Sequence, residues 1–293
     1  MKKILITGAN GYLASHLAEK LIRNNYEVIL VDKKKSNKTI LGSKILNIDI
    51  TKIKNYQSFF KNIKYVFHFA GLADISQSNK DSNQAITDNI IATNILIERC
   101  IKLKIERFFL ASTLYVYSKD KGGIYKITKK TCEELLLNAN LRFGLKYTIM
   151  KFGSIYGGST NNFNLIRNLF ICGVKNKNIN QPLSGKEIRS YIYIDDVIDI
   201  CLKLINKRFM NKDVLISGYE TISIKNLILK IENIINKKIK IKFNKIKNHD
   251  HYEKHVFDIK PKNLIKIKIK NYISLNDGLK REFNFVNSRY TKI

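Results

Sequence analysis

The chain has 293 residues, enough for one large α/β domain, or for one domain with a smaller attachment, around a sizeable core. Its hydrophobic content of 44% is ordinary for a soluble globular protein, and no apolar run is long enough to span a bilayer. The cysteines form no CxxC pair, so we expect free thiols in a reducing compartment and neither a zinc site nor a disulfide framework. The four are Cys100, Cys132, Cys172 and Cys201.

The net charge is +29, from 53 basic and 24 acidic residues. The excess is mainly lysine, spread along the whole chain together with many Asn and Ile, which indicates a coding bias rather than a binding patch. No recognition motif accompanies the charge, so we expect neither a nucleic-acid nor a membrane partner. A basic surface would still attract an anionic small substrate.

The first half alternates short apolar strands with helices. The first strand runs into a glycine-containing turn, which indicates a strand and turn rather than a signal peptide, and we expect a cytoplasmic protein. The expected strands are 4–6, 27–31, 65–69, 107–111 and 146–152, and the expected helices are 12–24, 53–62, 87–103 and 128–143. This alternation predicts an α/β fold with a doubly wound parallel sheet.

The second half is less regular. Helical periodicity occurs at 161–172, 194–205 and 224–236, whereas 238–243 and 266–270 alternate charged and apolar residues and predict half-exposed strands. The chain has only two prolines, so no linker is evident. We expect a smaller C-terminal α/β lobe that packs on the carboxyl edge of the sheet and contributes residues to a cleft.

A glycine turn of spacing GxxGxxA, which begins at Gly8, joins the first strand to the first helix. Glycines let the chain bend sharply and let a pyrophosphate approach the amides at a helix N-terminus. Asp32 ends the second strand, where a carboxylate can accept hydrogen bonds from a ribose of NAD and would repel the phosphate of NADP. Lys33, Lys34 and Lys35 follow and could tolerate that phosphate, but the pattern favours NAD.

Tyr125 and Lys129 have YxxxK spacing, which puts a phenol and an ammonium one helical turn apart on the same face. A nearby cation lowers the pKa of the phenol, so a tyrosinate can act as a base near neutral pH. The spacing recurs by chance in so lysine-rich a chain, at Tyr115/Lys119, Tyr117/Lys121 and Tyr147/Lys151. Only Tyr125 leads straight into a predicted helix, and it follows a hydroxyl pair, Ser112-Thr113, at a strand end.

Segments along nearly the whole chain resemble, in order, the extended short-chain dehydrogenase/reductases, and in particular the UDP-glucose 4-epimerase-like members of the nucleotide-sugar epimerase/dehydratase family. The segments that carry the resemblance are TGANGYLASH (7–16), VILVD (28–32), HFAGL (68–72), NIIATNILIE (89–98), STLYVYS (112–118), YKITK (125–129), KFGSIYG (151–157), IRSYIYIDDVID (188–199), ISGYETISIKNL (216–227) and SLNDGLKREFNF (274–285).

The resemblance implies a domain organisation and an assembly. It implies a Rossmann-type NAD-binding domain at 1–155, to which part of 188–218 returns, and a mainly substrate-binding lobe at 156–293. It also implies a homodimer, because the two long helices at 87–103 and 128–143 commonly pair with their copies in this family.

The resemblance also implies a site for NAD, residue by residue. It places Gly8, Asn10, Gly11, Tyr12 and Leu13 at the pyrophosphate, Asp32 and Lys33 at the adenosine ribose, Asp49 and Ile50 at the adenine, and Phe69, Ala70, Gly71 and Asn89 on the nicotinamide side. Asp49 has a second interpretation from the sequence alone, as a helix cap.

The catalytic residues that the resemblance implies are Thr113, Tyr125 as the acid/base and Lys129 as its partner, and Tyr125 and Lys129 also belong to the implied cofactor site. On the substrate side, Arg189 matches the arginine that grips the diphosphate. Ser154 stands where the family usually has an asparagine.

Two departures from the family pattern bear on the reaction. The segment between Thr113 and Tyr125 is shorter than in most members, so part of the substrate-side loop is missing. The dehydratase branch carries an Asp-Glu pair directly after its catalytic threonine, and Leu114 and Tyr115 hold those places here. The acid that expels water from the sugar is therefore absent, which counts against a 4,6-dehydratase.

We therefore expect NAD-dependent oxidoreduction at C4 of a nucleotide-diphosphate sugar, above all 4-epimerisation through a transient 4-keto intermediate, as in polysaccharide biosynthesis. In this hypothesis Tyr125 removes the proton of the C4 hydroxyl, Thr113 bridges the two oxygens, and Lys129 keeps the phenol acidic. A 4-dehydrogenase or 4-ketoreductase with a single net hydride transfer is the alternative. A non-catalytic NAD-binding protein is the alternative from another class.

Three other groups receive structural interpretations. His251 and His255 in HDHYEKH have a metal-like spacing, but we expect an exposed loop or helix start and no metal. His68 follows an apolar strand and is expected to be a packed core residue. Asp195 and Asp196 are expected to cap a helix rather than to act as paired carboxylates.

Overall fold

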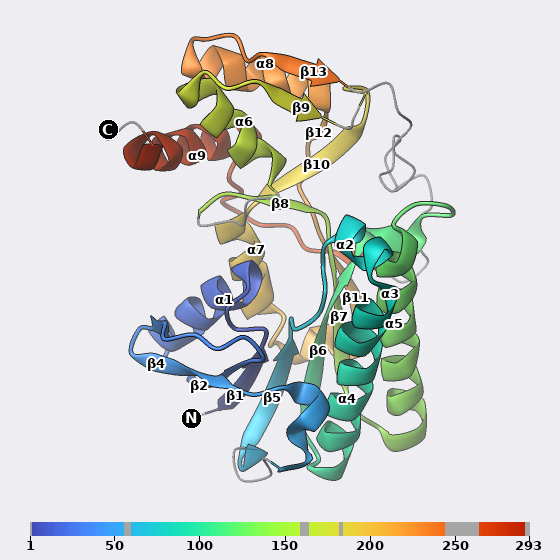
Figure 1. Ribbon diagram of the computed structural model, residues 1–293. Coiled ribbons are helices and arrows are strands. Elements are labelled where there is room, and N and C mark those ends of the chain that lie inside the picture. Colours follow the sequence, from blue (N-terminus) through green and yellow to red (C-terminus); the bar gives the residue numbers. More distant parts are fainter. Residues whose placement is uncertain (1, 56–59, 159–163, 182–183, 244–263, 291–293) are drawn as a thin grey trace. The chain divides into compact units, whose positions relative to one another are not determined.

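The computed structural model describes residues 2–55, 60–158, 164–181, 184–243 and 264–290 and divides into two compact units (Figure 1). Unit 1 comprises Met1–Phe152, Ile198–Leu215 and Lys260–Ile267. Unit 2 comprises Gly153–Val197, Ile216–Ile259 and Lys268–Ile293.

A nine-stranded sheet forms the centre of unit 1, in the order β14-β11-β7-β6-β5-β1-β2-β4-β3. Its strands are β1 (Lys3–Thr7), β2 (Glu27–Asp32), β3 (Thr39–Ile40), β4 (Ser43–Asn47), β5 (Ile63–His68), β6 (Arg107–Thr113), β7 (Tyr147–Phe152), β11 (Lys212–Ile216) and β14 (Leu264–Lys266). β1 pairs in parallel with both β2 and β5, and β6 continues in parallel between β5 and β7. The predicted α/β fold with a parallel sheet is confirmed.

The strand order reverses at β1. The chain passes from β1 through β2 to β4 on one side and then returns to β5, β6 and β7 on the other. In such sheets the crevice beyond the carboxyl ends of the strands at the reversal is the usual ligand site. Here those ends are Thr7 of β1 and His68 of β5, which pair with each other in the sheet.

The helices of unit 1 follow the strands. They are α1 (Tyr12–Arg23), α2 (Ile75–Lys80), α3 (Ser82–Ala85), the π-helix η3 (Ile86–Ile91), α4 (Ala92–Lys102), α5 (Gly123–Phe143) and part of α7 (Ile194–Lys203), with the 3-10 helices η1 (Ile50–Asn55), η4 (Leu114–Tyr117) and η5 (Lys207–Phe209). α4 and α5 lie side by side (Figure 1). Gly144 caps the C-terminus of α5, because its left-handed backbone lets its N–H bond the carbonyl of Asn140 at 2.9 Å.

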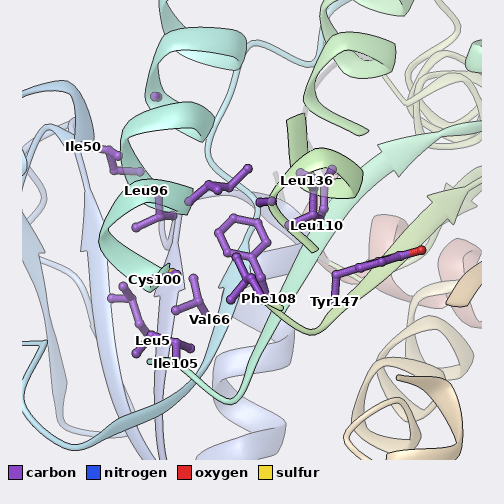
Figure 2. Packing of buried hydrophobic residues seen from close by; sticks show 14 of the residues in the cluster. Leu5, Ile50, Val66, Leu96, Cys100, Ile105, Phe108, Leu110, Leu136 and Tyr147 are labelled. Atoms are coloured by element: carbon purple, nitrogen blue, oxygen red, sulfur yellow. The ribbon is translucent and has the colours of Figure 1, made fainter. Parts of the chain in front are cut away.

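One hydrophobic cluster joins the sheet to α4 and α5. Figure 2 shows Val66 of β5 and Phe108 of β6 in this cluster, with Leu96 of α4 and Leu136 of α5. Every side chain of β6 is buried, as expected for a central parallel strand that is covered on both faces. The buried run RFFLA therefore determines where the end of β6, which carries Thr113, emerges from the core.

Two sequence predictions of secondary structure are wrong. The helix expected at 53–62 is a 3-10 helix over Ile50–Asn55, and residues 56–59 lie outside the described part. The strand expected at 266–270 is instead β14, Leu264–Lys266. β14 pairs in parallel with Asp213–Leu215 of β11, and the alternating pattern beyond Lys266 forms no strand.

Two helix starts also differ. The helix expected at 128–143 begins at Gly123, so Tyr125 lies inside it rather than ahead of it. The helix expected at 87–103 is two elements, because the backbone widens into a π-helix over Ile86–Ile91 before α4 begins. The apolar period of the sequence alone does not distinguish a π-helix from an α-helix.

The described part of unit 2 combines small sheets with helices. They are the sheet of β12 (Thr221–Ser223), β10 (Ile188–Tyr193) and β8 (Ser154–Tyr156), the pair of β13 (Ile241–Phe243) and β9 (Ile179–Gln181), and the helices α6 (Leu165–Lys175), α8 (Ile224–Ile235) and α9 (Leu275–Tyr290). A buried ion pair between Arg167 and Glu282, with Nε and Oε1 2.8 Å apart, joins α6 to α9. Among the described residues, no helix is long and apolar enough to cross a membrane.

Candidate functional site

A cavity of about 240 Å³ lies beyond the carboxyl ends of β1, β2 and β5 in unit 1. It is lined by Gly8, Asn10, Gly11, Asp32, Lys33, Lys34, Ile48, Asp49, Ile50, Phe69, Ala70, Gly71, Asp88 and Ala92. Most residues that the sequence predicts to contact a cofactor therefore share one cavity. The predicted residues outside its lining are Tyr12, Leu13, Asn89, Tyr125 and Lys129. Lys34, from the lysine run after Asp32, does line it, and the residues that the sequence pattern does not reveal are Ile48, Asp88 and Ala92.

Gly8 lets the turn after β1 touch the loop after β5. Its φ is +71°, and a Cβ atom there would lie 2.7 Å from the amide nitrogen of Ala70. That amide donates a hydrogen bond to Oγ1 of Thr7, at 3.2 Å. Any side chain at position 8 would separate the two loops that form this end of the cavity.

Asp32 is held in the cavity wall by two backbone amides. Oδ2 accepts a hydrogen bond from the N–H of Asn10 at 3.0 Å, and Oδ1 accepts one from the N–H of Lys34 at 2.8 Å. Asp49 accepts from the N–H and the hydroxyl of Thr51, so its predicted capping role is confirmed while it also lines the cavity.

One polar atom beside this cavity lacks a partner. Oδ1 of Asn10 is buried and accepts no hydrogen bond from the described residues, although Nδ2 of the same side chain donates to the carbonyl of Lys34 at 3.0 Å. Buried acceptors are nearly always paired in folded proteins. A dinucleotide with hydroxyl donors would satisfy this atom, so the residues present fit such a ligand.

Asn89 shapes the site from behind the cavity wall. Oδ1 accepts a hydrogen bond from the N–H of Leu72 at 2.7 Å, and Nδ2 donates to Oγ1 of Thr128 at 2.9 Å. A Cβ on Gly71 would clash with Asn89 and would lie 3.6 Å from Nζ of Lys129. Asn89 thus connects the loop after β5 to α5, and the ammonium of Lys129 lies near the cavity wall.

The three predicted catalytic residues meet at the end of β6. Thr113 is the last residue of β6, and its hydroxyl is hydrogen-bonded to the phenol of Tyr125, in the first turn of α5. Lys129 lies one turn further along α5, and its Nζ donates to the carbonyl of Ala111 at 3.1 Å. All three therefore surround one strand end.

Burial dominates the electrostatics of this trio. Burial raises the pKa of Tyr125 to about 12, and the hydrogen bond with Thr113 only partly offsets this rise. Burial also lowers the pKa of Lys129. In the protein alone, desolvation therefore dominates at Tyr125, while the ammonium of Lys129 bonds the carbonyl of Ala111.

The three competing YxxxK pairs have other environments, as their context predicts. Tyr147 and Lys151 lie on β7, so their side chains are not one helical turn apart. Tyr115 and Tyr117 belong to η4, which ends before Lys119 and Lys121. Of the four pairs, Tyr125 and Lys129 alone share one helix, although Tyr125 lies in the first turn of α5 and not ahead of it.

Lys151 takes part in a buried charge network that spacing does not predict. Its Nζ lies 2.7 Å from Oε2 of Glu133 on α5 and 3.1 Å from Oδ2 of Asp213 on β11. Burial alone would lower the pKa of Lys151, but the two carboxylates raise it well above its usual range. The hydroxyl of Ser112 donates to Oε1 of Glu133, so the network also holds the strand end that carries Thr113.

The predicted substrate residues, Ser154 and Arg189, belong to unit 2. Ser154 begins β8 and pairs with Tyr191 of β10. Arg189 lies on β10, is buried, and donates from Nη1 to the carbonyl of Ile188 at 2.9 Å. The two residues thus lie on neighbouring strands of one sheet.

The remaining candidates have structural roles. His68 is 1% exposed and is hydrogen-bonded to Thr7 at 2.7 Å and to Thr93 at 2.9 Å, so its interpretation as a core residue is confirmed. Asp195 and Asp196 lie in the first turn of α7, where carboxylates favour the helix dipole.

The metal and thiol predictions are tested only in part. HDHYEKH falls within 244–263, outside the described residues. In the described ranges, no group of three or more His, Cys, Asp or Glu side chains could hold a metal ion. The four cysteines are free thiols.

Comparisons of the sequence extend this picture. The family model described as "NAD dependent epimerase/dehydratase family" matches residues 4–216. The uncharacterized UDP-glucose epimerase YtcB of Bacillus subtilis is 26% identical, over 98% of this chain and 99% of its own length. A trifunctional UDP-glucose 4,6-dehydratase/epimerase/reductase of Arabidopsis thaliana is 27% identical over 68% of this chain, which matches only 34% of that longer protein.

Solved structures share the fold. The UDP-glucose 4-epimerase of Thermotoga maritima superposes with a TM-score of 0.83 at 23% identity, over 98% of this chain and 99% of that one. The UDP-glucuronic acid 4-epimerase of Bacillus cereus, in complex with UDP-glucuronic acid and NAD, gives the same TM-score of 0.83 at 23% identity, over 98% and 100%.

Proposed function

The chain belongs to the NAD dependent epimerase/dehydratase family, and from this premise we propose that it exchanges hydride between NAD and C4 of a nucleotide-diphosphate sugar. The reaction best supported is 4-epimerisation through a transient 4-keto sugar. The observation that carries the proposal is the meeting of Thr113, Tyr125 and Lys129 at the end of β6, with Lys129 next to Gly71 in the wall of the cavity.

The cavity has the features that a dinucleotide needs. Gly8 and Gly11 leave room for a pyrophosphate at the start of α1, with the unpaired Oδ1 of Asn10 beside it. Asp32 is oriented for the adenosine ribose, and Ile50 offers an apolar surface to adenine. When bound, NAD supplies the hydride acceptor and donor, and its cationic nicotinamide ring favours ionisation of a nearby phenol.

The catalytic steps of the chain itself are proton transfers. Tyr125 takes the proton of the C4 hydroxyl and returns it when the keto sugar is reduced. The Thr113 hydroxyl is already bonded to the phenol, so it can bridge the phenol and the sugar oxygen. Lys129 is buried with its ammonium at the strand end, where it can bind the nicotinamide ribose.

The residues after Thr113 favour this chemistry over dehydration. Leu114 is buried and apolar, and the N–H of Tyr115 bonds the hydroxyl of Thr113 at 3.3 Å. Neither position offers a carboxylic acid to expel water from the sugar. The second candidate function is a single net hydride transfer, as in a 4-dehydrogenase or 4-ketoreductase, which uses the same catalytic groups.

The substrate is proposed to be anionic. Arg189 of unit 2 is our candidate for the diphosphate and Ser154 for the sugar side, with unit 1 binding NAD. The net charge of +29 favours the approach of a nucleotide diphosphate from solution.

Assays with UDP-, GDP- and CDP-sugars test the proposal, with C4 configuration and NADH absorbance followed together. We expect inversion at C4 without net NADH. The Tyr125→Phe variant should lose about 100-fold or more in rate, because it removes the proton acceptor. Tyr147→Phe removes a phenol from β7 and serves as the matched control, with activity retained.

Three outcomes would contradict the proposal in different ways. Net NADH without C4 inversion would replace epimerisation by a single oxidation or reduction. Full activity in Tyr125→Phe would remove the catalytic assignment. Binding of NAD without turnover of any sugar nucleotide would indicate a non-catalytic cofactor-binding protein.

We also propose a homodimer formed through α4 and α5. Large apolar side chains are exposed on α5 and just after α4, where a partner surface would cover them. On α5 they include Ile127 and Leu141, and Leu103 follows the end of α4.

A further inference from the structure

An ion pair in the wall of the cavity joins two segments far apart in the sequence. Nζ of Lys33 lies 2.6 Å from Oδ1 and 2.5 Å from Oδ2 of Asp88. Both residues line the cavity, together with Asp32. Lys33 follows directly after β2, and Asp88 lies in the π-helix η3.

The π-helix places two neighbouring residues in different surroundings. Asp88 lines the cavity, with its side chain 14% exposed, whereas Asn89 is buried and bonds Leu72 and Thr128. Widened turns of this kind recur at functional sites. Lys33, at 43% side-chain exposure, is the more accessible partner, so Asp88 limits where its ammonium can go.

The position of this pair bears on which dinucleotide fits. Asp32 is oriented by two amides for a ribose hydroxyl, and Lys33 is its neighbour in the chain. A free ammonium beside that hydroxyl would attract the phosphate that NADP carries there, and so offset the repulsion from Asp32. The ion pair neutralises Lys33, so the repulsion from Asp32 is left without this counterbalance.

We propose that Asp88 is a specificity-determining residue, which makes the cavity prefer NAD over NADP by engaging the ammonium of Lys33. The inference rests on the proposed binding of NAD in this cavity. The lysine run after Asp32 could tolerate the phosphate of NADP, but its first lysine is engaged by a carboxylate from another element.

Titration calorimetry with NAD and NADP on the full chain tests this role without any turnover. Asp88→Asn should tighten NADP binding about fivefold while NAD affinity changes less than about twofold, since a partly exposed charge pair contributes on this scale. The gain should shrink at high salt, because screening weakens the attraction. The double variant Lys33→Gln/Asp88→Asn should lose this gain in NADP affinity.

Glu106→Gln is the matched control. Glu106 pairs with Lys64 at 2.7 Å, both groups are exposed, and neither lines the cavity. This variant changes the net charge as Asp88→Asn does and also frees a lysine, yet the ratio of NADP to NAD affinity should stay at the wild-type value. An equal gain in both variants would show a general charge effect and overturn the inference.

The remaining outcomes separate this inference from the proposed function. If the wild type binds NAD and Asp88→Asn leaves the affinity ratio unchanged, the role of Asp88 is overturned and NAD binding stands. If the wild type binds neither dinucleotide, NAD binding itself is overturned, and the inference with it. Should Asp88→Asn fold poorly by circular dichroism, Asp88→Ser replaces it, with the same gain expected.

Discussion

His68 shows how burial at the end of β5 determines the charge of a single side chain. Burial lowers the pKa of His68 to about 3, and the positive charge of Lys129 lowers it further. Both ring nitrogens are hydrogen-bonded to threonines, Thr7 and Thr93. The neutral ring therefore packs beside the strand ends of the cavity without adding a charge there.

This pKa predicts a pH dependence of stability. The pKa of His68 in the folded protein lies below its unfolded value of about 6.5. The free energy of unfolding is therefore highest above pH 6.5 and falls as the pH drops from there towards 3, because the unfolded state binds the proton first. When the pH is lowered from 7 to 5, His68 should decrease the free energy of unfolding by about 2 kcal/mol. Urea unfolding should show that His68→Gln lacks this part of the pH dependence.

His16→Gln provides the control for that experiment. His16 lies on α1, and its ring bonds the carbonyl of Tyr12 at 2.8 Å. The control should keep the wild-type pH dependence. If the unfolding free energy depends on pH in the same way in His68→Gln and in the wild type, the lowered pKa of His68 is contradicted.

At the scale of elements, a buried charge network ties α5 to β7 and β11. Glu133 and Lys151 are each 2% exposed, and the network extends to Asp213 and to Ser112 at the end of β6. Removing one partner of a buried pair leaves an uncompensated charge, whereas replacing both partners by apolar residues avoids that cost. The network therefore holds the helix that carries Tyr125 against the strand end that carries Thr113.

We expect Glu133→Leu to lower the unfolding free energy by about 3 kcal/mol or more, and the double variant Glu133→Leu/Lys151→Met to lose clearly less. Urea unfolding measures both. Glu134→Gln breaks the exposed pair with Lys130, whose side chains are 60% and 52% exposed, and should cost under about 1 kcal/mol. Additive losses in the double variant would mean that Glu133 and Lys151 are not energetically coupled.

At the scale of the whole molecule, the exposed apolar residues of α5 predict its assembly. Ile127 is 53% exposed and Leu141 is 84% exposed. They are 14 residues apart, close to four helical turns, so they lie on one face. We expect Ile127→Glu/Leu141→Glu to convert a dimer into a folded monomer, because two buried carboxylates would oppose association.

Light scattering coupled to gel filtration measures this change. Phe143→Glu is the control, since Phe143 is 63% exposed but lies on the opposite side of α5 from Ile127. The control should remain dimeric. A wild-type protein that is monomeric at all concentrations would exclude the proposed assembly.

Local sequence patterns were sufficient for the parallel sheet of unit 1 and for the Gly8 turn and Asp32 of the cavity, whereas the family resemblance supplied most of the other lining residues. Alternating apolar strands and helices predict the parallel sheet, and the turn at Gly8 with Asp32 predicts the cavity, because turn chemistry and strand ends depend on neighbouring residues. The position of Tyr125 at the start of a helix likewise distinguishes it from three chance spacings. Boundaries such as those of β14 could not be predicted, since they depend on pairing with a strand that is distant in the sequence.

The electrostatics of the site were decided only by the tertiary structure. The pairing of Lys33 with Asp88 spans 55 positions, and that of Lys151 with Glu133 joins a strand to a helix across the core. The raised pKa of Tyr125 follows from burial, which outweighs the opposing effect of the hydrogen bond with Thr113. Spacing along the chain encodes periodicity and turns, whereas desolvation and ion pairing depend on which elements pack together.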